Sequence, residues 1–216
     1  MLNSLELKNC RNFAKFKTGL MSRNFIVGAN GTGKSTILEA IRVLSVGKSF
    51  RTAILAELIR HREKYCRVRA AINDKRAVEF FYGSQFVAQQ IKDRQLTYQG
   101  NTIGWTDFLG VFPTVLFTPT DLEIVLGSPD GRRRYLDSVL WQVSAEYRRS
   151  QLEFWQVLRE RSALLFMVKI NRASPDELEP WNEMLLKLTQ TIREARTGYA
   201  AYLNTSLESG VKKQEA

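Results

Sequence analysis

The sequence predicts an α/β protein in which a domain of mixed sheet and helices precedes a helical-hairpin arm. Three observations indicate this architecture: β-rich runs before residue 128, a complete phosphate-binding loop among them, and two long segments of helical periodicity after them. We expect the first domain over residues 1–128, the arm over 129–206 and a frayed tail over 207–216.

The first domain opens with two predicted strands. Leu5 and Leu7 alternate with Glu6 and Lys8, which is typical of a half-buried strand. The short apolar run Phe25–Val27 predicts a second, fully buried strand that leads directly into a glycine-rich loop.

Two later features predict more strands. The β-rich runs Val68–Ile72 and Val78–Tyr82 are divided by residues 73–77, which favours a hairpin with a five-residue connection. The run Leu96–Tyr98 precedes a turn-like segment, 99–102, and predicts another strand that leaves through a turn.

The glycine-rich loop spans Gly28–Ser35 and matches the pattern G-x-x-x-x-G-K-[ST], directly before the helix-prone stretch Thr36–Ile41. In such a loop the backbone N–H groups surround a polyphosphate, Lys34 reaches the β- and γ-phosphates, and the Ser35 hydroxyl completes a Mg²⁺ shell. The predicted nucleotide-binding residues are Gly28, Ala29, Asn30, Gly31, Thr32, Gly33, Lys34, Ser35 and Thr36, with Ser35 also the predicted metal ligand. A simple glycine turn before a helix would leave three glycines ahead of a lysine unexplained.

The composition narrows the class of protein. Of the 216 residues 44% are hydrophobic, and no stretch approaches the ~20 apolar residues of a membrane span. The N-terminal residues have neither a basic leader nor an apolar signal region, so we expect a cytoplasmic protein.

Cys10 and Cys66 are too few for a disulfide framework and too far apart for a metal knuckle, so we expect two buried thiols. The single histidine, His61, receives no role.

The formal charge of +10 is unevenly distributed. Residues 1–76 contain 16 Lys or Arg against 5 Asp or Glu, whereas residues 77–216 contain 16 against 17. The basic excess therefore lies in the part with the phosphate loop and favours binding of a polyanion, either a nucleotide or a nucleic-acid backbone. Surface lysines that serve only solubility are the alternative.

The arm is predicted from two matching helix starts, Ser128-Pro129-Asp130 and Ser174-Pro175-Asp176, the second with Glu177 placed to close a capping box. Two long helices should follow, and the short connection at 171–173 makes them antiparallel neighbours. Pro180 would interrupt one hydrogen bond and favours a kink in the first turns of the second helix.

The apolar stripe of the first helix comprises Leu136, Leu140, Val143, Tyr147, Phe154, Val157, Leu164 and Val168. That of the second follows a heptad pattern through Leu178, Trp181, Leu185, Leu188, Ile192, Ala195, Tyr199 and Tyr202.

Four segments together resemble the N-terminal portion of the RecF family: Leu5–Phe13, the phosphate loop, Gly47–Thr52 and Phe117–Asp137. Thr120 departs from the acidic residue expected there. The resemblance implies a P-loop ATPase head of the ABC and SMC type that binds ATP and Mg²⁺ and forms an ATP-dependent homodimer. It also implies a DNA-binding recombination mediator that works with RecR and RecO to place RecA on gapped DNA during repair.

The family continues beyond this segment, with an ABC-type signature and a Walker B strand ending in acidic residues. The nearest Walker B candidate here is Thr114–Asp121, in which Pro119 and two threonines precede the acid. The sequence therefore indicates a chain truncated relative to the family and puts ATP hydrolysis by this chain alone in doubt.

Several roles stay open at this point. Arg51 and Arg132–Arg134 are candidates for phosphate or DNA contacts, and Arg132 and Arg133 equally for structural ion pairs with Asp137 or Asp121. The four tryptophans are assigned to core packing rather than to base stacking. The alternative functions are an inactive interaction module and an unrelated P-loop kinase or GTPase, although no Asn-Lys-x-Asp guanine reader is present.

Overall fold

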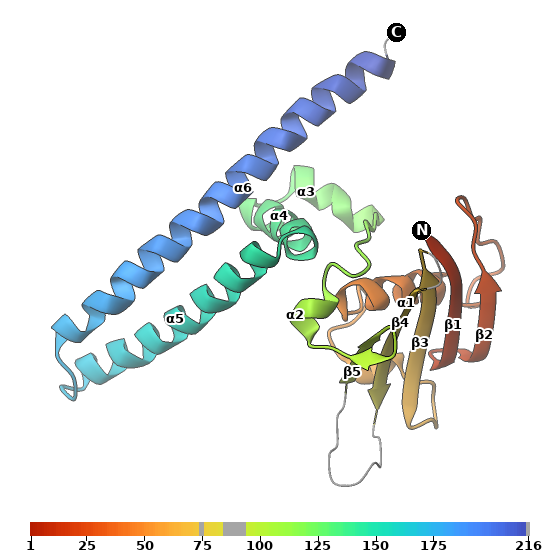
Figure 1. Cartoon of the computed structure of the whole chain (residues 1–216), viewed down its shortest axis with the longest axis horizontal. Helices are drawn as coiled ribbons and strands as arrows, with labels where there is room; N and C mark the ends of the chain where they lie inside the picture. Colours follow the sequence, from red (N-terminus) through yellow and green to blue (C-terminus); the bar gives the residue numbers. More distant parts are fainter. Residues whose placement is uncertain (74–75, 84–93, 215–216) are drawn as a thin grey trace. The chain divides into compact units, whose positions relative to one another are not determined.

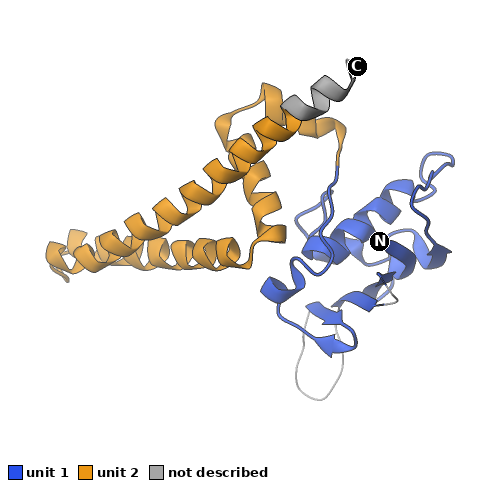
Figure 2. Cartoon of the chain, turned by 45° about the horizontal axis from the view of Figure 1, so that its top comes forward, with its two compact units in different colours: residues 1–116 blue, residues 117–216 orange. Residues whose placement is uncertain are grey.

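The computed structural model describes residues 1–73, 76–83 and 94–214, with side chains described as far as Leu207. The chain forms two compact units, Met1–Leu116 and Phe117–Ala216 (Figures 1 and 2). This division falls before the predicted boundary at residue 128. Residues 117–128, which lead into the arm, therefore belong to the second unit. None of the described helices is both long and apolar enough to cross a membrane.

Unit 1 is built on an antiparallel sheet with the order β2-β1-β3-β4-β5-β6. The strands are β1 Leu2–Cys10, β2 Phe13–Gly19, β3 Tyr65–Ile72, β4 Arg76–Gly83, β5 Arg94–Tyr98 and β6 Asn101–Thr102. Helix α1, Lys34–Val46, covers one face of the sheet (Figure 1), and the short helices η1, Leu55–Leu58, and α2, Trp105–Phe108, complete the unit. This arrangement confirms the predicted mixed α/β domain.

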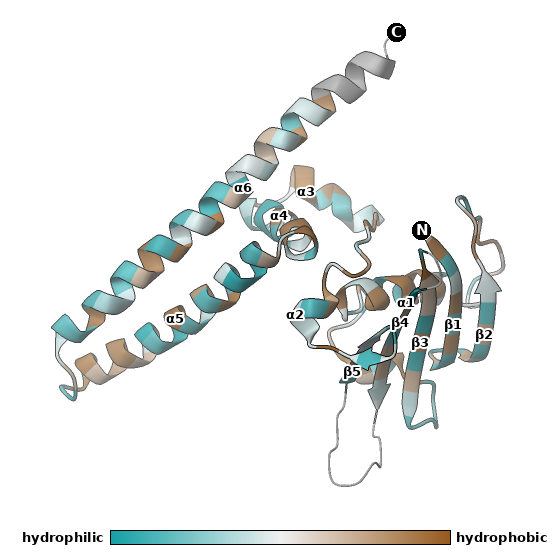
Figure 3. Ribbon diagram, in the orientation of Figure 1, coloured by the Kyte–Doolittle hydropathy of each residue, from teal (hydrophilic) through white to brown (hydrophobic). Residues whose placement is uncertain are grey.

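The core of unit 1 lies between α1 and the sheet. The helix contributes Ile37, Ala40, Val43 and Leu44, while the strands contribute Leu5, Leu7, Val68, Val78 and Phe80 among others. Along β1 and β3 hydrophobic and hydrophilic residues alternate, as Figure 3 shows, because successive side chains point to opposite faces. The sheet therefore keeps one polar face toward solvent.

Most predicted strands are present, with different ends. Strands β3 and β4 are longer than expected, since Ile72 pairs with Arg76 and leaves only residues 73–75 as the connection; residues 74 and 75 lie outside the described residues. The predicted turn after β5 is confirmed, with Gln99 and Gly100 at φ values of 50° and 85°. Strand β2 was not predicted, because its alternation of aromatic and basic residues follows β1 without a strong turn signal.

The predicted buried strand Phe25–Val27 is wrong. The segment forms no strand, and Phe25 and Val27 are 91% and 90% exposed. An apolar run becomes a buried strand only when neighbouring strands pair with it and cover both faces. Within the described residues, the six-stranded sheet provides no such neighbour.

The expected free thiols are also wrong, although both cysteines are buried as predicted. Cys10 and Cys66 form a disulfide that joins β1 to β3, with their Cα atoms 5.0 Å apart. The antiparallel pairing of these strands brings together two residues that are 56 positions apart in sequence. Sequence spacing alone did not reveal that proximity.

Unit 2 is helical. Its elements are η2 Pro119–Leu122, α3 Glu123–Leu126, α4 Pro129–Val143, α5 Ala145–Lys169, η3 Pro175–Leu178 and α6 Glu179–Gln214. The hairpin of α5 and α6 confirms the predicted antiparallel pair (Figure 1). Helix α6 extends to Gln214, through most of the segment predicted to fray.

The first predicted arm helix is in fact two helices. The chain breaks at Ser144, whose hydroxyl accepts a 3.0 Å hydrogen bond from the Tyr147 backbone N–H and so caps α5. The second predicted start is confirmed, because Ser174 and Glu177 form the expected capping box. Pro180 occupies the second position of α6, where no intrahelical donor is needed, so it does not interrupt the helix.

The heptad stripe of α6 is confirmed along most of its length. Leu188 and Ile192 are buried, and Ala195 and Tyr199 pack with Leu140 and Tyr147 around Ile192. Tyr202 is 65% exposed, so the packed part of the stripe ends one position earlier than predicted.

A polar cluster fixes the helices of unit 2 to one another. Asp137 of α4 accepts hydrogen bonds of 2.7 and 2.8 Å from Arg196 of α6 and one of 2.5 Å from the Tyr147 hydroxyl of α5. Burial alone would raise the pKa of Asp137, but the hydrogen bonds from Arg196 and Tyr147 outweigh it and lower the pKa. Burial and the hydrogen bond to Asp137 raise the pKa of Tyr147 in turn.

We expect Asp137→Asn to destabilise the arm by about 2 kcal/mol at neutral pH, since hydrogen bonds to a charged group in a partly buried site contribute on this scale. Because the folded pKa is depressed, this contribution is present above the unfolded pKa, near 3.9, and is lost as the pH falls through the folded value. Urea unfolding monitored by circular dichroism at several pH values measures both effects. The exposed Glu183→Gln is the control, and equal stability of the two variants would contradict the assignment.

Candidate nucleotide site

The predicted phosphate loop forms a turn that ends at the first residue of α1. Gly31 and Gly33 have φ values of 83° and 103°, a region that only glycine adopts readily. The Thr32 hydroxyl donates a 2.9 Å hydrogen bond to the Ala29 carbonyl and closes the turn. Gly33 occupies the N-cap position of α1, so the unpaired N–H groups of the first helical turn face the loop.

Lys34 hydrogen-bonds to the loop that precedes it. Its ammonium donates hydrogen bonds of 2.7 and 2.8 Å to the carbonyl oxygens of Gly28 and Ala29. An ammonium has three N–H donors, so one donor is left for a further acceptor. The positive charge of Lys34 is therefore held over the loop.

The turn between β1 and β2 supports the loop from the other side. The Asn12 side chain donates a 3.2 Å hydrogen bond to the Gly31 carbonyl and accepts one of 3.4 Å from the Thr36 hydroxyl. A Cβ atom on Gly33 would lie 2.6 Å from the Phe13 ring. The loop thus passes so close to Phe13 of β2 that a Cβ at Gly33 would require the ring to shift.

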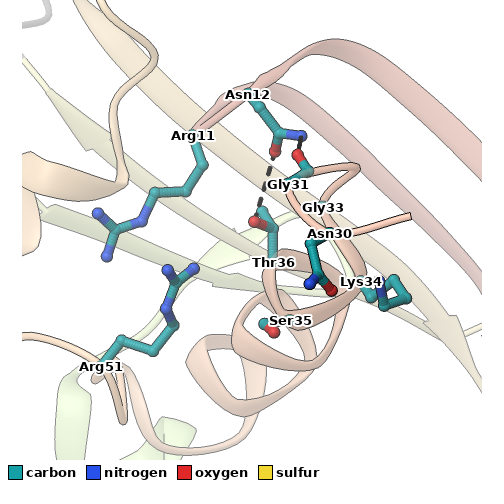
Figure 4. Close-up of a pocket in the computed structure, with 9 residues that line it drawn as sticks. All are labelled: Arg11, Asn12, Asn30, Gly31, Gly33, Lys34, Ser35, Thr36 and Arg51. Atoms are coloured by element: carbon teal, nitrogen blue, oxygen red, sulfur yellow. Dashed lines mark hydrogen bonds between the residues drawn. The ribbon is translucent and has the colours of Figure 1, made fainter. Parts of the chain in front are cut away.

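In front of the loop is a hollow of about 350 Å³. Its lining residues, shown in Figure 4, are Arg11, Asn12, Asn30, Gly31, Gly33, Lys34, Ser35, Thr36 and Arg51. The guanidinium groups of Arg11 and Arg51 point toward each other on the side opposite the loop (Figure 4). The hollow is therefore bordered by cations and backbone donors, which suits a polyphosphate.

One buried carboxylate contacts both arginines, and Arg11 also lies 3.6 Å from Glu57. Glu39, fully buried on α1, accepts hydrogen bonds of 2.8 and 3.2 Å from Arg11 and one of 3.3 Å from Arg51. The Ser49 hydroxyl donates a further bond of 2.5 Å to the same carboxylate and accepts one of 2.9 Å from the Arg51 backbone N–H. Burial alone would raise the pKa of Glu39, but the hydrogen bonds from Arg11 and Ser49 outweigh it and lower the pKa. Glu39 is thus an anion at neutral pH.

The structure brings together most of the predicted site residues. Asn30, Gly31, Gly33, Lys34, Ser35 and Thr36 line the hollow, whereas Gly28 and Ala29 hold Lys34 and Thr32 braces the turn. Arg51, a candidate from the sequence for either a phosphate or a DNA contact, also lines the hollow. The sequence reasoning missed Arg11, Asn12 and Glu39 as site residues, although Arg11 and Asn12 belong to the segment on which the family resemblance rests.

The residues present fit a polyphosphate better than they fit a complete metal site. Among the described residues, no group of three or more Asp, Glu, His or Cys side chains could hold a metal ion. The hydroxyls at the hollow are those of Ser35 and Thr36, and the Thr36 hydroxyl donates to Asn12, so Mg²⁺ bound by Ser35 would depend on phosphate oxygens and on water for its other ligands.

The Walker B candidate is not a strand. Residues 113–118 form no regular structure, and the carboxylate of Asp121 accepts hydrogen bonds from the Thr118 N–H and hydroxyl in a capping box at the start of η2. Asp121 therefore has a structural role at this helix start.

The arginines at the start of α4 also make local contacts. Arg133 pairs with Asp130, and Arg132 and Arg134 donate to the carbonyl oxygens of Gly127 and Asp130. The structural alternative named Asp137 or Asp121 as partners, but Asp137 binds Arg196 and Asp121 binds Thr118. These contacts favour the structural alternative for Arg133.

The fold and the loop together define an α/β protein of the P-loop class. The family model described as the RecF/RecN/SMC N terminal domain matches residues 1–103. The DNA replication and repair protein RecF of Caldanaerobacter subterraneus subsp. tengcongensis is 33% identical over 209 residues, which cover 95% of this chain and 57% of the relative. The RecF of Heliobacterium modesticaldum is 34% identical over 205 residues, covering 92% of this chain and 54% of the relative.

Solved structures agree with the sequence relatives. The structure of the recombination mediator protein RecF with ATPrS in the RecFOR pathway superposes with a TM-score of 0.84 at 32% identity, over 95% of this chain and 56% of the other. The corresponding structure with ATP gives a TM-score of 0.83 at 33% identity. The chain is therefore a homologue of RecF and corresponds to its N-terminal portion, spanning little more than half of the length of these relatives.

Two glycines of the loop provide a matched test of its packing. We expect Gly31→Ala to cost about 1 kcal/mol of stability, because its positive φ strains an alanine but nothing lies within 4 Å of the added Cβ. Gly33→Ala should cost at least about 2 kcal/mol more, because the same strain is joined by the clash with Phe13. Chemical unfolding of both variants measures the difference, and equal losses would contradict the close approach to β2.

Glu39→Gln tests the buried anion. We expect a loss of about 3 kcal/mol at neutral pH, because Arg51 keeps its charge without this counter-charge and Arg11 retains only the ion pair with Glu57, 3.6 Å away. The depressed pKa means that the stabilisation is present above the unfolded value, near 4.3, and is lost as the pH falls through the folded value. Wild type and variant should therefore converge in acid, which unfolding curves at neutral and acidic pH will show. A gap that stays constant with pH would argue against an ionised Glu39.

Proposed function

We propose that this chain binds ATP with Mg²⁺ at the hollow beside α1 and couples that binding to DNA, as a recombination mediator of RecF type. The observation that carries the proposal is the arrangement of the hollow: backbone donors and Lys34 on one side, Arg11 and Arg51 on the other. Opposed cations of this kind suit the distributed negative charge of a triphosphate.

Within this proposal each group has a separate task. The N–H groups at the start of α1 bind phosphate oxygens, and Lys34 gives its third donor to the terminal phosphates. Ser35 supplies one ligand to Mg²⁺, which neutralises part of the phosphate charge when bound. Glu39 is a positioning residue, because it orients Arg11 and Arg51 without facing the ligand.

The wider activity belongs to the same proposal. By homology with RecF, the chain would act on gapped DNA in repair and replication restart, with RecO and RecR as partners, RecA loading as the outcome and ATP-dependent dimerisation as the switch. The basic excess of residues 1–76 supports a polyanionic partner. We assign ATP binding rather than hydrolysis to this chain, because Asp121 serves as a helix cap.

We expect Lys34→Ala to weaken ATP binding at least about tenfold and to abolish any enhancement of DNA binding by ATP and Mg²⁺, because the charge over the loop is lost. Calorimetry with ATP and Mg²⁺, and fluorescence anisotropy of a labelled duplex with and without ATP, measure the two effects. Lys187→Ala, an exposed lysine of α6, is the matched control. Unchanged ATP affinity in Lys34→Ala would overturn the proposed site.

A further inference from the structure

The solvent face of the sheet in unit 1 carries two neighbouring rows of charged side chains with different patterns. In one row, Glu6 lies opposite Lys17 on β2 and opposite Arg69 on β3, and Arg69 in turn lies opposite Glu79 on β4. Each cation of this row therefore faces an acid on the adjacent strand. Such opposite-charge pairs stabilise a sheet.

The adjacent row has no acid directly opposite Lys8, although Arg67 forms an ion pair with Glu79 at 3.6 Å. Lys8 on β1 lies opposite Lys15 on β2 and opposite Arg67 on β3, which places three cations side by side across three strands. Like charges directly opposite each other destabilise a sheet. Repulsion within this row therefore destabilises the folded sheet. An anion bound across the row would reduce this repulsion.

Two of these cations lie over aromatic rings. The Lys8 ammonium lies 5.6 Å from the centre of the Tyr65 ring, and the Arg67 guanidinium lies 5.7 Å from that of Phe81. Tyr65 and Phe81 stack on each other with ring centres 5.5 Å apart. The aromatic pair thus lies beneath two cations of the row without neutralising them.

One buried donor in the row is left without a hydrogen bond. Arg67 Nε is buried and makes no hydrogen bond to any described residue, since the nearest carboxylate oxygen, on Glu79, is 3.6 Å away. At 3.6 Å the carboxylate provides ion pairing only. The Arg67 side chain as a whole is 43% exposed, so a phosphate would contact the part of the guanidinium other than Nε.

The two rows border a shallow hollow of about 230 Å³. Its lining residues are Glu6, Lys8, Lys15, Arg67, Arg69 and Glu79, which sum to four positive and two negative charges, a net charge of +2. The hollow lies on the solvent face of the sheet, whereas the apolar residues of β1 and β3 face α1. It is therefore separate from the nucleotide hollow.

We propose that the row Lys15–Lys8–Arg67 binds the phosphodiester backbone of DNA. Three cations on adjacent strands span roughly 10 Å, because neighbouring strands are about 4.8 Å apart, and this is long enough to contact successive phosphates. The proposal rests on the proposed DNA binding and assigns it a surface. The contacts are to the backbone, so they carry no sequence preference.

Two lysines of β2 provide a matched test. Lys15→Gln and Lys17→Gln make the same charge change on the same strand and face, but Lys15 lies opposite Lys8 whereas Lys17 lies opposite Glu6. We expect Lys15→Gln to weaken duplex binding severalfold and to lower the slope of log K against log salt by about 1. Lys17→Gln should change affinity by less than about twofold, since Lys17 lies opposite an acid rather than another cation.

The double variant Lys8→Gln/Lys15→Gln should lose about tenfold in affinity and about 2 in the salt slope. The measurement is fluorescence anisotropy of a labelled mixed-sequence duplex titrated with the full chain at several salt concentrations, with a labelled oligo-dT strand in parallel. Thermal melting should show each row variant at least as stable as wild type, because the mutations remove like-charge repulsion. If the double variant does not fold, the single variants decide the test.

Each outcome separates the two proposals. Equal affinity of Lys15→Gln and Lys17→Gln, or unchanged affinity of the double variant, would overturn the assignment of the row while leaving DNA binding intact. Wild type that binds neither duplex nor oligo-dT at low salt would overturn the DNA-binding part of the proposed function and this inference with it. ATP affinity, measured separately, should be unchanged in every row variant.

Discussion

The arrangement of unit 1 around the phosphate loop depends on one buried anion. Glu39 lies on α1, but its hydrogen-bond partners come from other segments. Arg11 belongs to the β1–β2 turn, and Ser49 and Arg51 belong to the segment that follows the helix. A carboxylate without counter-charges would be costly to bury, so folding of the helix requires both segments to be in place. The groups that border the hollow are thereby assembled together.

In unit 2 a carboxylate likewise connects several segments through hydrogen bonds. Asp137, Tyr147 and Arg196 come from three different helices, and their hydrogen bonds connect α4, α5 and α6 where the apolar stripe alone would allow sliding. Heptad stripes specify that helices pack, but a polar cluster specifies their register. Each unit thus combines an apolar core with one charged centre that selects a single arrangement.

Local signals in the sequence predicted what depends on local chemistry. The phosphate loop, the start of α1, the capping box at Ser174 and the turn after β5 all follow from residues a few positions apart. Features that depend on distant partners were missed: the disulfide between Cys10 and Cys66, the role of Glu39, and the exposure of Phe25. The break at Ser144 was missed because helical periodicity continues on both sides of it.

The unpaired segment Phe25–Val27 has a consequence for the energetics of the loop that follows it. No neighbouring strand among the described residues fixes the chain that enters the loop, so ordering this segment on ligand binding would carry an entropic cost that reduces the net binding free energy. A polypeptide that paired with these residues would meet that entropic requirement beforehand. Strand pairing at one end of the loop and ligand binding at the other would then be thermodynamically linked, each strengthening the other by the same factor.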